Sequence, residues 1–393
     1  MRIKEIVKKV LGKKLIGIYH YIWAFLSAMV FGFPSKKLTV IGVTGTSGKS
    51  TTCDLITRIL EEAGNKVAST STIRFKIADK EWENKYKMSM PGRFVLQRFL
   101  KQAKEAGCKF VVLEVTSEGI KQFRHKFINF DTAVFTNLGR EHLESHGGFE
   151  KYRNEKLKLF KATKNVHVIN ADDKSAKYFL DIPAKKKITY TLKEAKELNL
   201  SLKLPGEFNL YNAMSAVSVA RVYGISLDTC RKALEKATGI PGRMELLQKD
   251  PFGVIVDYAH TPEQLESVYK TLNGNLVCVL GSCGGGRDKW KRPVLGEIAA
   301  RYCKEIIITN EDPYDEDPLE IMEEVSKGIK EKDFCIVVDR KEAIKKAIDS
   351  AKPGDTVIIT GKGSEPWMCV ANGEKIPWDD RQIAKDFLKI KNK

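Results

Sequence analysis

The stretch VIGVTGTSGKST, residues 40–51, joins an apolar run to glycines, a lysine and hydroxyl groups. Glycines allow backbone N–H groups to face a ligand, and the start of a following helix attracts anions. Lys49 could reach a phosphate, and the Ser50 hydroxyl could bind Mg²⁺. We therefore predict a loop that holds the phosphates of a nucleotide, formed by Gly45, Thr46, Ser47, Gly48, Lys49, Ser50 and Thr51. The alternative is a glycine turn before a helix, and the glycines at 42 and 45 depart from the strict GxxxxGK spacing.

Three other positions carry groups that could act with this loop. Glu114 ends an apolar run in LEVTSEG, where its carboxylate could bind Mg²⁺ or simply be solvated. His142 and His146 are four residues apart on an expected helix, a spacing that also suits a zinc pair, but the HExxH order is absent. Lys156 lies in a charge-rich helix whose ordinary role is a solvated face. Each residue keeps both interpretations at this point.

The C-terminal half holds two more motifs. VDYAHTP places Asp257 and His260 at the end of an expected strand, and GGGRDKWKRP joins flexible glycines to Arg287 and further basic residues. A ligand-binding turn and a glycine turn with incidental basic residues both fit this pattern.

The elements that must position these groups are strands and helices in alternation after Pro34. Continuous apolar runs separated by helical stretches predict mostly parallel sheets covered on both faces. The runs are LTVIGV, FVVLEV, TAVFTN, NVHVIN, GVIVDY, LVCVLG, EIIITN, FCIVV and TVIITG. Such sheets bind ligands at the carboxyl ends of their strands, where the polar motifs stand. A Gly- and Pro-containing segment at 237–247 predicts a domain boundary, giving domains 38–240 and 241–393.

Composition narrows the classes of function. The chain has 393 residues, 42% of them hydrophobic, and a net charge of +17. Residues 1–37 hold eight Lys or Arg against one Glu. A basic surface favours acidic partners, but no nucleic-acid motif accompanies it, so we expect no nucleic-acid partner. Eight cysteines without a CxxC pair argue against a zinc ribbon and a secreted, disulfide-stapled fold, and indicate a reducing, cytoplasmic compartment.

Residues 15–33 carry no formal charge and have lysines on both sides. The sequence leaves open a helix on an anionic membrane surface and a helix packed on the protein itself, with a true span as the less favoured reading. The first alternative predicts membrane-surface contact at the inner face of the membrane. The oligomeric state is left open.

Ordered motifs from about Leu38 to the C-terminus resemble the Mur ligase family, in particular its UDP-N-acetylmuramoyl-tripeptide synthetase branch. They are TGTSGKST, LEVTSEG, FTNLGREHLESHGG, NEKLKLF, GEFNLYNAMSA, GRMELL, VDYAHTP, GGGRDKWKRP, GKGSE and DDR. The resemblance implies an α/β protein with a P-loop-type central ATPase domain and a C-terminal Rossmann-like domain. It implies an ATP-dependent ligase that joins an amino acid to a muramyl-peptide carboxylate through an acyl phosphate, in peptidoglycan precursor synthesis.

The same resemblance implies roles for single residues. Lys49, Lys156 and His142 would be catalytic, and Ser50, Glu114, His142 and Lys156 would hold Mg²⁺. Lys156 would carry a carbamate formed from CO₂. ATP would also contact Asn209, Asn212, Arg243 and Asp257. The acceptor and the amino acid would contact Ser89, Arg287, Asp312, Tyr314 and Glu365.

The chain also departs from the family pattern. Only 37 residues precede the ATPase strand, so we expect the uridine-binding domain to be absent. The family's DNPR motif aligns with EDPY, which replaces an arginine by Tyr314 and removes a two-point contact to a carboxylate. Ser364 and Glu118 stand where the family has histidines. A folylpolyglutamate-synthase-like ligase and a non-catalytic ATP-binding scaffold are the alternatives.

Overall fold

The computed structural model describes residues 13–391 except 87, 142, 201 and 273. Residues 1–12, which begin the basic N-terminal segment, and His142 therefore lie outside the described residues. The chain forms two compact units. The first comprises the described residues of Met1–Leu138, Glu150–Ser201 and Leu210–Lys236; the second comprises those of Gly139–Phe149, Leu202–Asn209 and Ala237–Lys393.

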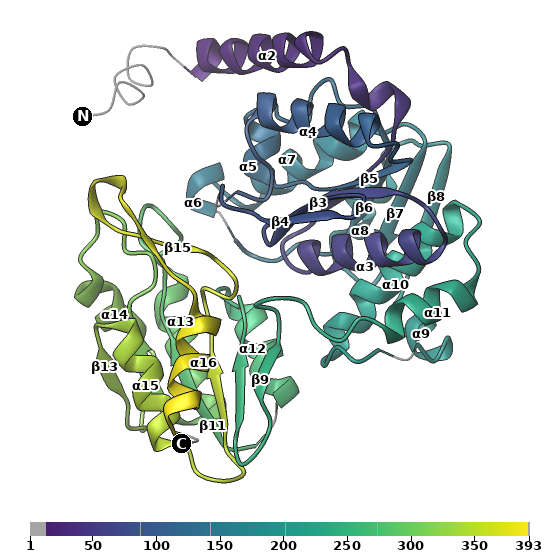
Figure 1. The fold of residues 1–393 in the computed structure, drawn as a ribbon. Coiled ribbons are helices and arrows are strands. Elements are labelled where there is room, and N and C mark those ends of the chain that lie inside the picture. Colours follow the sequence, from purple (N-terminus) through teal and green to yellow (C-terminus); the bar gives the residue numbers. More distant parts are fainter. Residues whose placement is uncertain (1–12, 87, 142, 201, 273, 392–393) are drawn as a thin grey trace. The chain divides into compact units, whose positions relative to one another are not determined.

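An eight-stranded sheet organises the first unit, with strand order β4-β3-β2-β5-β1-β6-β7-β8 (Figure 1). Six of the strands run parallel, whereas β3 and β4 form antiparallel pairs at one edge. The strands are β1 (Thr39–Thr44), β2 (Val67–Thr70), β3 (Arg74–Ile77), β4 (Lys80–Glu83), β5 (Phe110–Glu114), β6 (Phe130–Phe135), β7 (Val166–Asn170) and β8 (Lys186–Tyr190).

Helices cover both faces of this sheet, because its central strands are apolar on both sides. All five residues of β5 are buried, as are all residues of β1 after Thr39. Helix α3 lies on one face and α4, α5 and α7 lie on the other (Figure 1). The helices of this half are α2 (Lys13–Val30), η1 (Pro34–Lys37), α3 (Lys49–Glu62), α4 (Arg93–Glu105), α5 (Ser117–Lys121), α7 (Phe149–Ala162), α8 (Ala176–Leu180), α9 (Leu192–Glu197), α10 (Glu207–Val222) and α11 (Leu227–Glu235).

The second unit is built on a six-stranded sheet of order β13-β12-β11-β14-β10-β9, parallel except for β9. Strands β15 and β16 form a separate antiparallel pair. The strands are β9 (Glu245–Gln248), β10 (Gly253–Val256), β11 (Leu276–Leu280), β12 (Cys303–Thr309), β13 (Cys335–Val337), β14 (Thr356–Ile359), β15 (Trp367–Cys369) and β16 (Lys375–Pro377). The helices are α6 (Leu143–His146), α12 (Pro262–Leu272), α13 (Lys291–Tyr302), α14 (Pro318–Ser326), α15 (Arg340–Ser350), η2 (Ala371–Gly373) and α16 (Asp380–Lys391).

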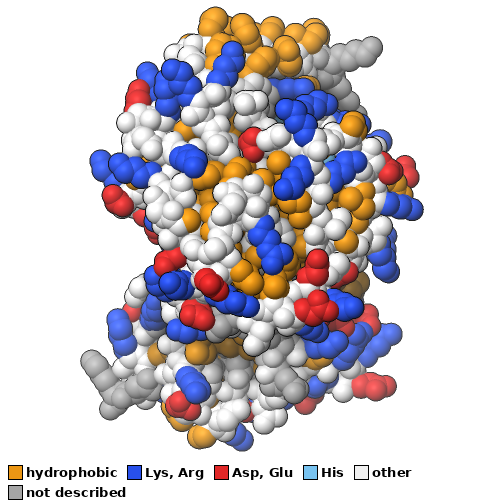
Figure 2. All heavy atoms as spheres, turned by 90° about the vertical axis from the view of Figure 1, so that its right-hand side faces the viewer, with side chains coloured by type: hydrophobic (Ala, Val, Ile, Leu, Met, Phe, Trp, Pro, Cys, Tyr) orange, Lys and Arg blue, Asp and Glu red, His pale blue; other side chains and the backbone are white. Residues whose placement is uncertain are grey.

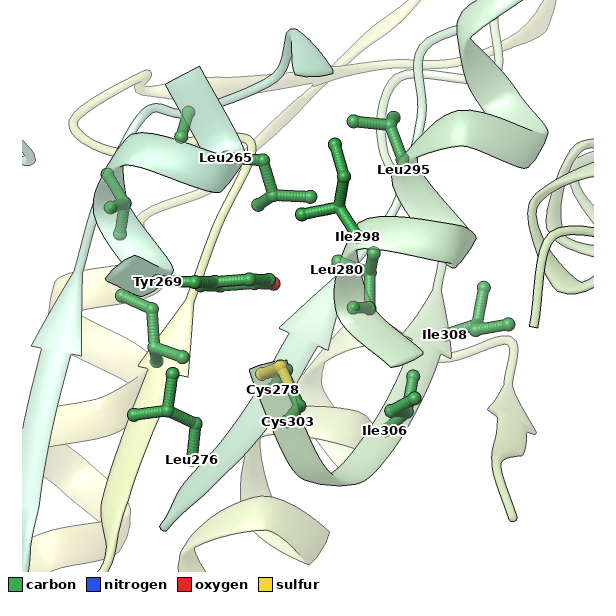
Figure 3. Packing of buried hydrophobic residues seen from close by; sticks show 14 of the residues in the cluster. Leu265, Tyr269, Leu276, Cys278, Leu280, Leu295, Ile298, Cys303, Ile306 and Ile308 are labelled. Atoms are coloured by element: carbon green, nitrogen blue, oxygen red, sulfur yellow. A yellow bond between two sulfur atoms is a disulfide. The ribbon is translucent and has the colours of Figure 1, made fainter. Parts of the chain in front are cut away.

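Two apolar clusters form the core of the second unit, one on each face of its sheet. Side chains of α12, α13 and α14 fill the first cluster, and those of α15 and α16 fill the second. Cys278 of β11 and Cys303 at the start of β12 form a buried disulfide within the first cluster, beside Leu276 and Ile306 (Figure 3). The cysteine spacing did not predict this bond, since the two residues are 25 positions apart.

The strand and helix predictions are confirmed where the pattern was continuous. All nine apolar runs form strands, and the helix predicted to follow the glycine-rich loop spans Lys49–Glu62. Seven strands were not predicted, because each has only three to five residues and none forms a continuous apolar run with its flanks: β2, β3, β4, β8, β9, β15 and β16. None of the helices within the described residues is long and apolar enough to cross a membrane, so the reading of residues 15–33 as a span is not supported.

Candidate active site

The glycine-rich loop lies at the carboxyl end of β1 and leads directly into α3. Its backbone is fixed by Asn137, which follows β6: the N–H of Thr46 donates to the Asn137 carbonyl at 2.9 Å, and the N–H of Ser47 donates to Asn137 Oδ1 at 2.8 Å. The Thr46 hydroxyl also lies 3.0 Å from the Tyr152 hydroxyl. Gly48 caps α3 without a side-chain hydrogen bond. The loop therefore lies at the N-terminus of a 14-residue helix, a position that favours anions.

At two positions in the loop only glycine fits, because a Cβ atom would collide with neighbouring atoms. A Cβ atom on Gly45 would lie 1.9 Å from the Thr136 hydroxyl oxygen. A Cβ atom on Gly48 would lie 2.2 Å from Asn212 Oδ1, and Gly48 has a φ of 78°, in the left-handed region. Asn212 also accepts a hydrogen bond of 3.3 Å from the Thr52 hydroxyl, so its amide is held over the start of α3.

Four residues from separate parts of the sequence form a chain of hydrogen bonds beside the loop. The Ser50 hydroxyl donates to Glu114 Oε2 at 2.7 Å, and both groups are buried. Glu114 also accepts from the N–H of Thr72 at 2.9 Å and from its hydroxyl at 3.1 Å. The Thr72 hydroxyl in turn contacts the Ser89 hydroxyl. Three residues predicted for metal or substrate binding are thus brought together through Thr72, which the sequence did not single out.

Lys156 on α7 is buried against the same loop, with 1% of its surface exposed. Its Nζ donates to the Gly45 carbonyl at 2.7 Å and lies 4.6 Å from the centre of the Tyr152 ring. The alternative of a solvated helix face is therefore wrong for this lysine, although the neighbouring Lys158 does lie at the surface and pairs with Glu155 at 2.6 Å.

Of the two histidines in the predicted helix, the structure describes only His146. His142 lies outside the described residues, and His146 is buried at the end of α6 with its Nδ1 2.9 Å from the Ser145 hydroxyl. Across the described part of the chain, no group of three or more His, Cys, Asp or Glu side chains is arranged to hold a metal ion. Of the predicted metal ligands that the structure describes, Ser50 and Glu114 lie 2.7 Å apart beside the loop.

Arg243, Tyr258 and Asp257 are fixed together in the second unit. The Arg243 guanidinium stacks 4.1 Å from the centre of the Tyr258 ring. Asp257 accepts hydrogen bonds from the N–H groups of Met244 at 2.7 Å and Ala259 at 2.6 Å. Burial raises the pKa of Asp257, while the Arg243 charge opposes the rise. Asn209, on the first turn of α10, donates to the Pro205 carbonyl at 2.6 Å.

A second cluster surrounds Lys362, in the GKGSE motif. Its Nζ lies 2.8 Å from Asp312 Oδ1 and 2.7 Å from Glu365 Oε2, and all three side chains are largely buried. The Tyr258 hydroxyl donates to Glu365 Oε1 at 3.0 Å. Burial, then the Glu365 charge, raise the pKa of Tyr258. This cluster joins Glu365 and Asp312 to the Arg243 stack, a link that the separate motifs did not predict.

Residues at the ends of β11 and β12 complete this cluster. Asp312 and Tyr314 both have positive φ angles, 43° and 54°, which are uncommon for residues other than glycine. The Cys283 thiol donates to Glu311 Oε1 at 2.9 Å. Burial lowers the pKa of Arg287, but the nearby Cys283, Tyr314 and Tyr258 side chains together raise it by more, so the net shift is upward. Four predicted substrate residues, Arg287, Asp312, Tyr314 and Glu365, thus share one polar cluster in this unit.

Comparison with known proteins assigns the family. The model of the Mur ligase middle domain matches residues 43–198, and the model of the Mur ligase glutamate ligase domain matches residues 242–363. The chain is 40% identical over 385 residues to a UDP-N-acetylmuramoyl-L-alanyl-D-glutamate–2,6-diaminopimelate ligase of Aquifex aeolicus, covering 91% of this chain and 79% of that relative. The chain belongs to the Mur ligase family. This confirms the predicted resemblance and fold class, and makes the protein an ATP-dependent carbon–nitrogen ligase.

Solved structures agree with this assignment. A 2,6-diaminopimelate ligase of the same name aligns with a TM-score of 0.59 at 31% identity, covering 91% of this Mur ligase and 79% of that chain. A folylpolyglutamate synthase of Mycobacterium tuberculosis aligns with a TM-score of 0.68 at 16% identity, over 86% of this chain and 92% of that one. The second likeness shows a shared fold only.

The crowding at Gly48 gives a test of the loop in this Mur ligase. We expect Gly48→Ala to raise the KM for ATP by about tenfold or more, because the added methyl group would displace Asn212 and strain the αL backbone by roughly 1–2 kcal/mol. Gly64→Ala is the matched control, since Gly64 has a φ of 79° with no atom within 4 Å of an added Cβ. It should lower stability and leave the KM unchanged; equal KM values in both variants would contradict the role of space at Gly48.

Proposed function

We propose that this Mur ligase uses ATP to join an amino acid to the carboxylate of a muramyl peptide in the synthesis of peptidoglycan precursors. The proposal rests on the family assignment and on one observation above all: the loop, the Ser50–Glu114 pair and Lys156 lie together at the carboxyl ends of β1 and β5. We retain residues 38–240 as its ATP-binding domain and residues 241–393 as its C-terminal domain.

The reaction has two steps. A carboxylate is a poor electrophile, so an oxygen of the acceptor carboxylate attacks the γ-phosphorus of ATP, giving an acyl phosphate and ADP. The amine of the incoming amino acid then attacks the acyl carbon, and the resulting tetrahedral intermediate expels inorganic phosphate and loses a proton. In the first step Lys49 and the backbone N–H groups of the loop would neutralise charge on the transferring phosphoryl group.

The residues around the loop suit ATP with Mg²⁺. Ser50 and Glu114 present hydroxyl and carboxylate oxygens 2.7 Å apart, the hard ligands that Mg²⁺ prefers. Bound there, Mg²⁺ would offset charge on the phosphate oxygens. Thr72 fixes the orientation of Glu114 through two hydrogen bonds. His142 stays a proposed metal ligand from the family motif.

Lys156 is proposed to carry a carbamate. Its neutral amine would attack CO₂ and release one proton, replacing a cation by a carboxylate-like group that could hold a second Mg²⁺. The side chain is buried, so the carbamate would be formed beside the loop and out of bulk water. The short contact to Gly45 keeps this side chain at the loop.

The polar cluster of the second unit is proposed to bind the amino acid. Arg287, Asp312, Tyr314 and Glu365 would contact it, and Ser89 of the first unit would contact the acceptor. Arg243, Asp257, Asn209 and Asn212 are proposed as further ATP contacts. Because Tyr314 offers a phenol in place of a guanidinium, we expect amino acids without a distal carboxylate to be preferred over diaminopimelate.

We also propose where the enzyme works. The family assignment supports a cytoplasmic enzyme, and residues 15–33 are proposed to contact the inner face of the membrane. The acceptor would then be drawn from a pool at or near that surface.

Phosphate release tests the proposed reaction. With ATP and Mg²⁺, release should require both a muramyl-peptide acceptor and one amino acid, and diaminopimelate should be among the poorer amino acids. Release that needs neither would favour an ATP-binding scaffold, whereas release that needs a folate acceptor and glutamate would favour a folylpolyglutamate-synthase-like ligase. The panel therefore separates the proposed function from both alternatives.

A further inference from the structure

Helix α2 buries its small residues and exposes its large apolar ones. The side that packs on the first unit is made of small residues: Ala24, Ser27 and Ala28 are each no more than 1% exposed. The large apolar residues lie on the other side, with Ile18 54% exposed and Val30 62% exposed. An ordinary surface helix buries its large apolar residues and exposes polar ones. The outward face of α2 is therefore built for an apolar environment.

The helix is nonetheless fixed to the protein. The Trp23 ring lies 5.7 Å from that of Phe94 on α4, and the rings of Tyr21 and Phe25 lie 5.2 Å and 5.4 Å from that of Phe127. The Ser27 hydroxyl donates to the Ala24 carbonyl at 2.9 Å, so the one polar side chain of this buried stripe is satisfied within the helix. These contacts hold the outward face in one orientation.

The outward face is large, continuous and uncharged. Its exposed apolar residues span the helix from end to end: Leu15, Ile18, Tyr19, Ile22, Met29 and Val30. Figure 2 shows apolar side chains gathered at the end of the first unit where α2 lies in Figure 1, with Lys and Arg side chains close below them. Soluble proteins rarely expose an apolar surface of this kind unless it binds a partner or a membrane.

Positive charge lies beside one end of the face. Lys36 and Lys37, both exposed, follow α2 in η1. A groove of about 330 Å³ beside α2 is lined by Tyr19, Trp23, Gly92, Arg93, Phe94 and Val95. Arg93 thus lines the same groove as the aromatic rings of Tyr19, Trp23 and Phe94. An apolar centre with aromatic and basic borders matches a bilayer that carries anionic headgroups.

We propose that α2 lies flat in the interface of an anionic phospholipid bilayer, with its small-residue side on the protein and its large apolar side among the acyl chains. Helix α2 has 18 residues, and none of the described helices is long and apolar enough to cross a membrane. In this arrangement α2 anchors the enzyme to one leaflet. The inference rests on the membrane contact proposed above and adds the face, the orientation and the lipid charge. A second copy of the chain would instead need to match Lys36 and Lys37 with acidic groups.

Vesicle binding by the full-length protein tests this inference. The wild type should co-sediment with vesicles that contain phosphatidylglycerol and bind pure phosphatidylcholine vesicles more weakly. Ile18→Glu/Ile22→Glu should weaken binding to the anionic vesicles by at least about tenfold, because both side chains are about half exposed and would enter the apolar layer. Lys36→Glu/Lys37→Glu should weaken it by about tenfold and remove most of its salt dependence.

Ile390→Glu is the matched control, since Ile390 is 70% exposed on α16 of the second unit. It should bind vesicles like the wild type.

The Ile18→Glu/Ile22→Glu variant should melt at the wild-type temperature and release phosphate at the wild-type rate with a water-soluble acceptor. Unchanged vesicle binding by this variant, or no binding by the wild type, would overturn the inference, as would a lipid-free dimer that the variant abolishes. Loss of phosphate release in the wild type, with vesicle binding intact, would count only against the proposed reaction.

Discussion

Lys156→Ala should lower the rate of amide formation by about 10³-fold, because it removes the group proposed to carry a carboxylate charge beside the loop. Two further results would follow from a carbamate. Wild-type activity should fall when CO₂ is removed from the buffer and recover when bicarbonate is added. Acetate, a small carboxylate able to enter the space left by the side chain, should restore part of the activity of Lys156→Ala. Phosphate release under these conditions is the measurement.

Lys158→Ala is the control for this experiment. Lys158 lies two residues away on α7 but is exposed and paired with Glu155, so its loss should change activity less than about twofold. Loss of activity in Lys156→Ala that is indifferent to CO₂ and to acetate would assign Lys156 a structural role at Gly45 and contradict the carbamate.

Arg340→Met should destabilise the second unit by about 3–5 kcal/mol, because it leaves a buried carboxylate without its charge partner. Arg340 Nε and Nη2 donate to Asp380 at 2.9 and 2.7 Å, and neither side chain of the pair is exposed. Nη2 also donates to the Thr360 carbonyl at 2.7 Å, so the arginine ties α15 and α16 to the end of β14. Urea denaturation, followed by tryptophan fluorescence and circular dichroism, would measure the loss.

The neighbouring residue in the DDR motif supplies the control. Arg381 pairs with Asp379 at 2.7 Å, but both side chains are partly exposed, at 19% and 32%. Arg381→Met should therefore cost less than about 1 kcal/mol. Arg340→Met/Asp380→Leu should recover part of the loss in Arg340→Met, since it removes the uncompensated charge. Equal losses in the two single variants would contradict the assignment.

The sequence by itself determined the parts of this Mur ligase that depend on local pattern. The strands with continuous apolar runs, the start of α3 at Lys49 and the phosphate-type loop follow from residue type and spacing within a few positions. In the sequence, α2 was recognisable only as an uncharged stretch, because nearly all of its residues after Lys14 are apolar or small and the pattern does not tell which side packs.

The tertiary structure decided which distant residues meet. Thr72 and Glu114 are 42 positions apart, Thr46 and Tyr152 are 106 apart, and Gly45 and Lys156 are 111 apart. A charge-rich helix gives no local sign that one of its lysines is buried, since that depends on the contact of α7 with the loop after β1. The short edge strands were likewise decided by pairing with neighbours rather than by their own residues. Local periodicity fixes elements, whereas a site assembled at strand ends depends on the order and direction of strands in the sheet.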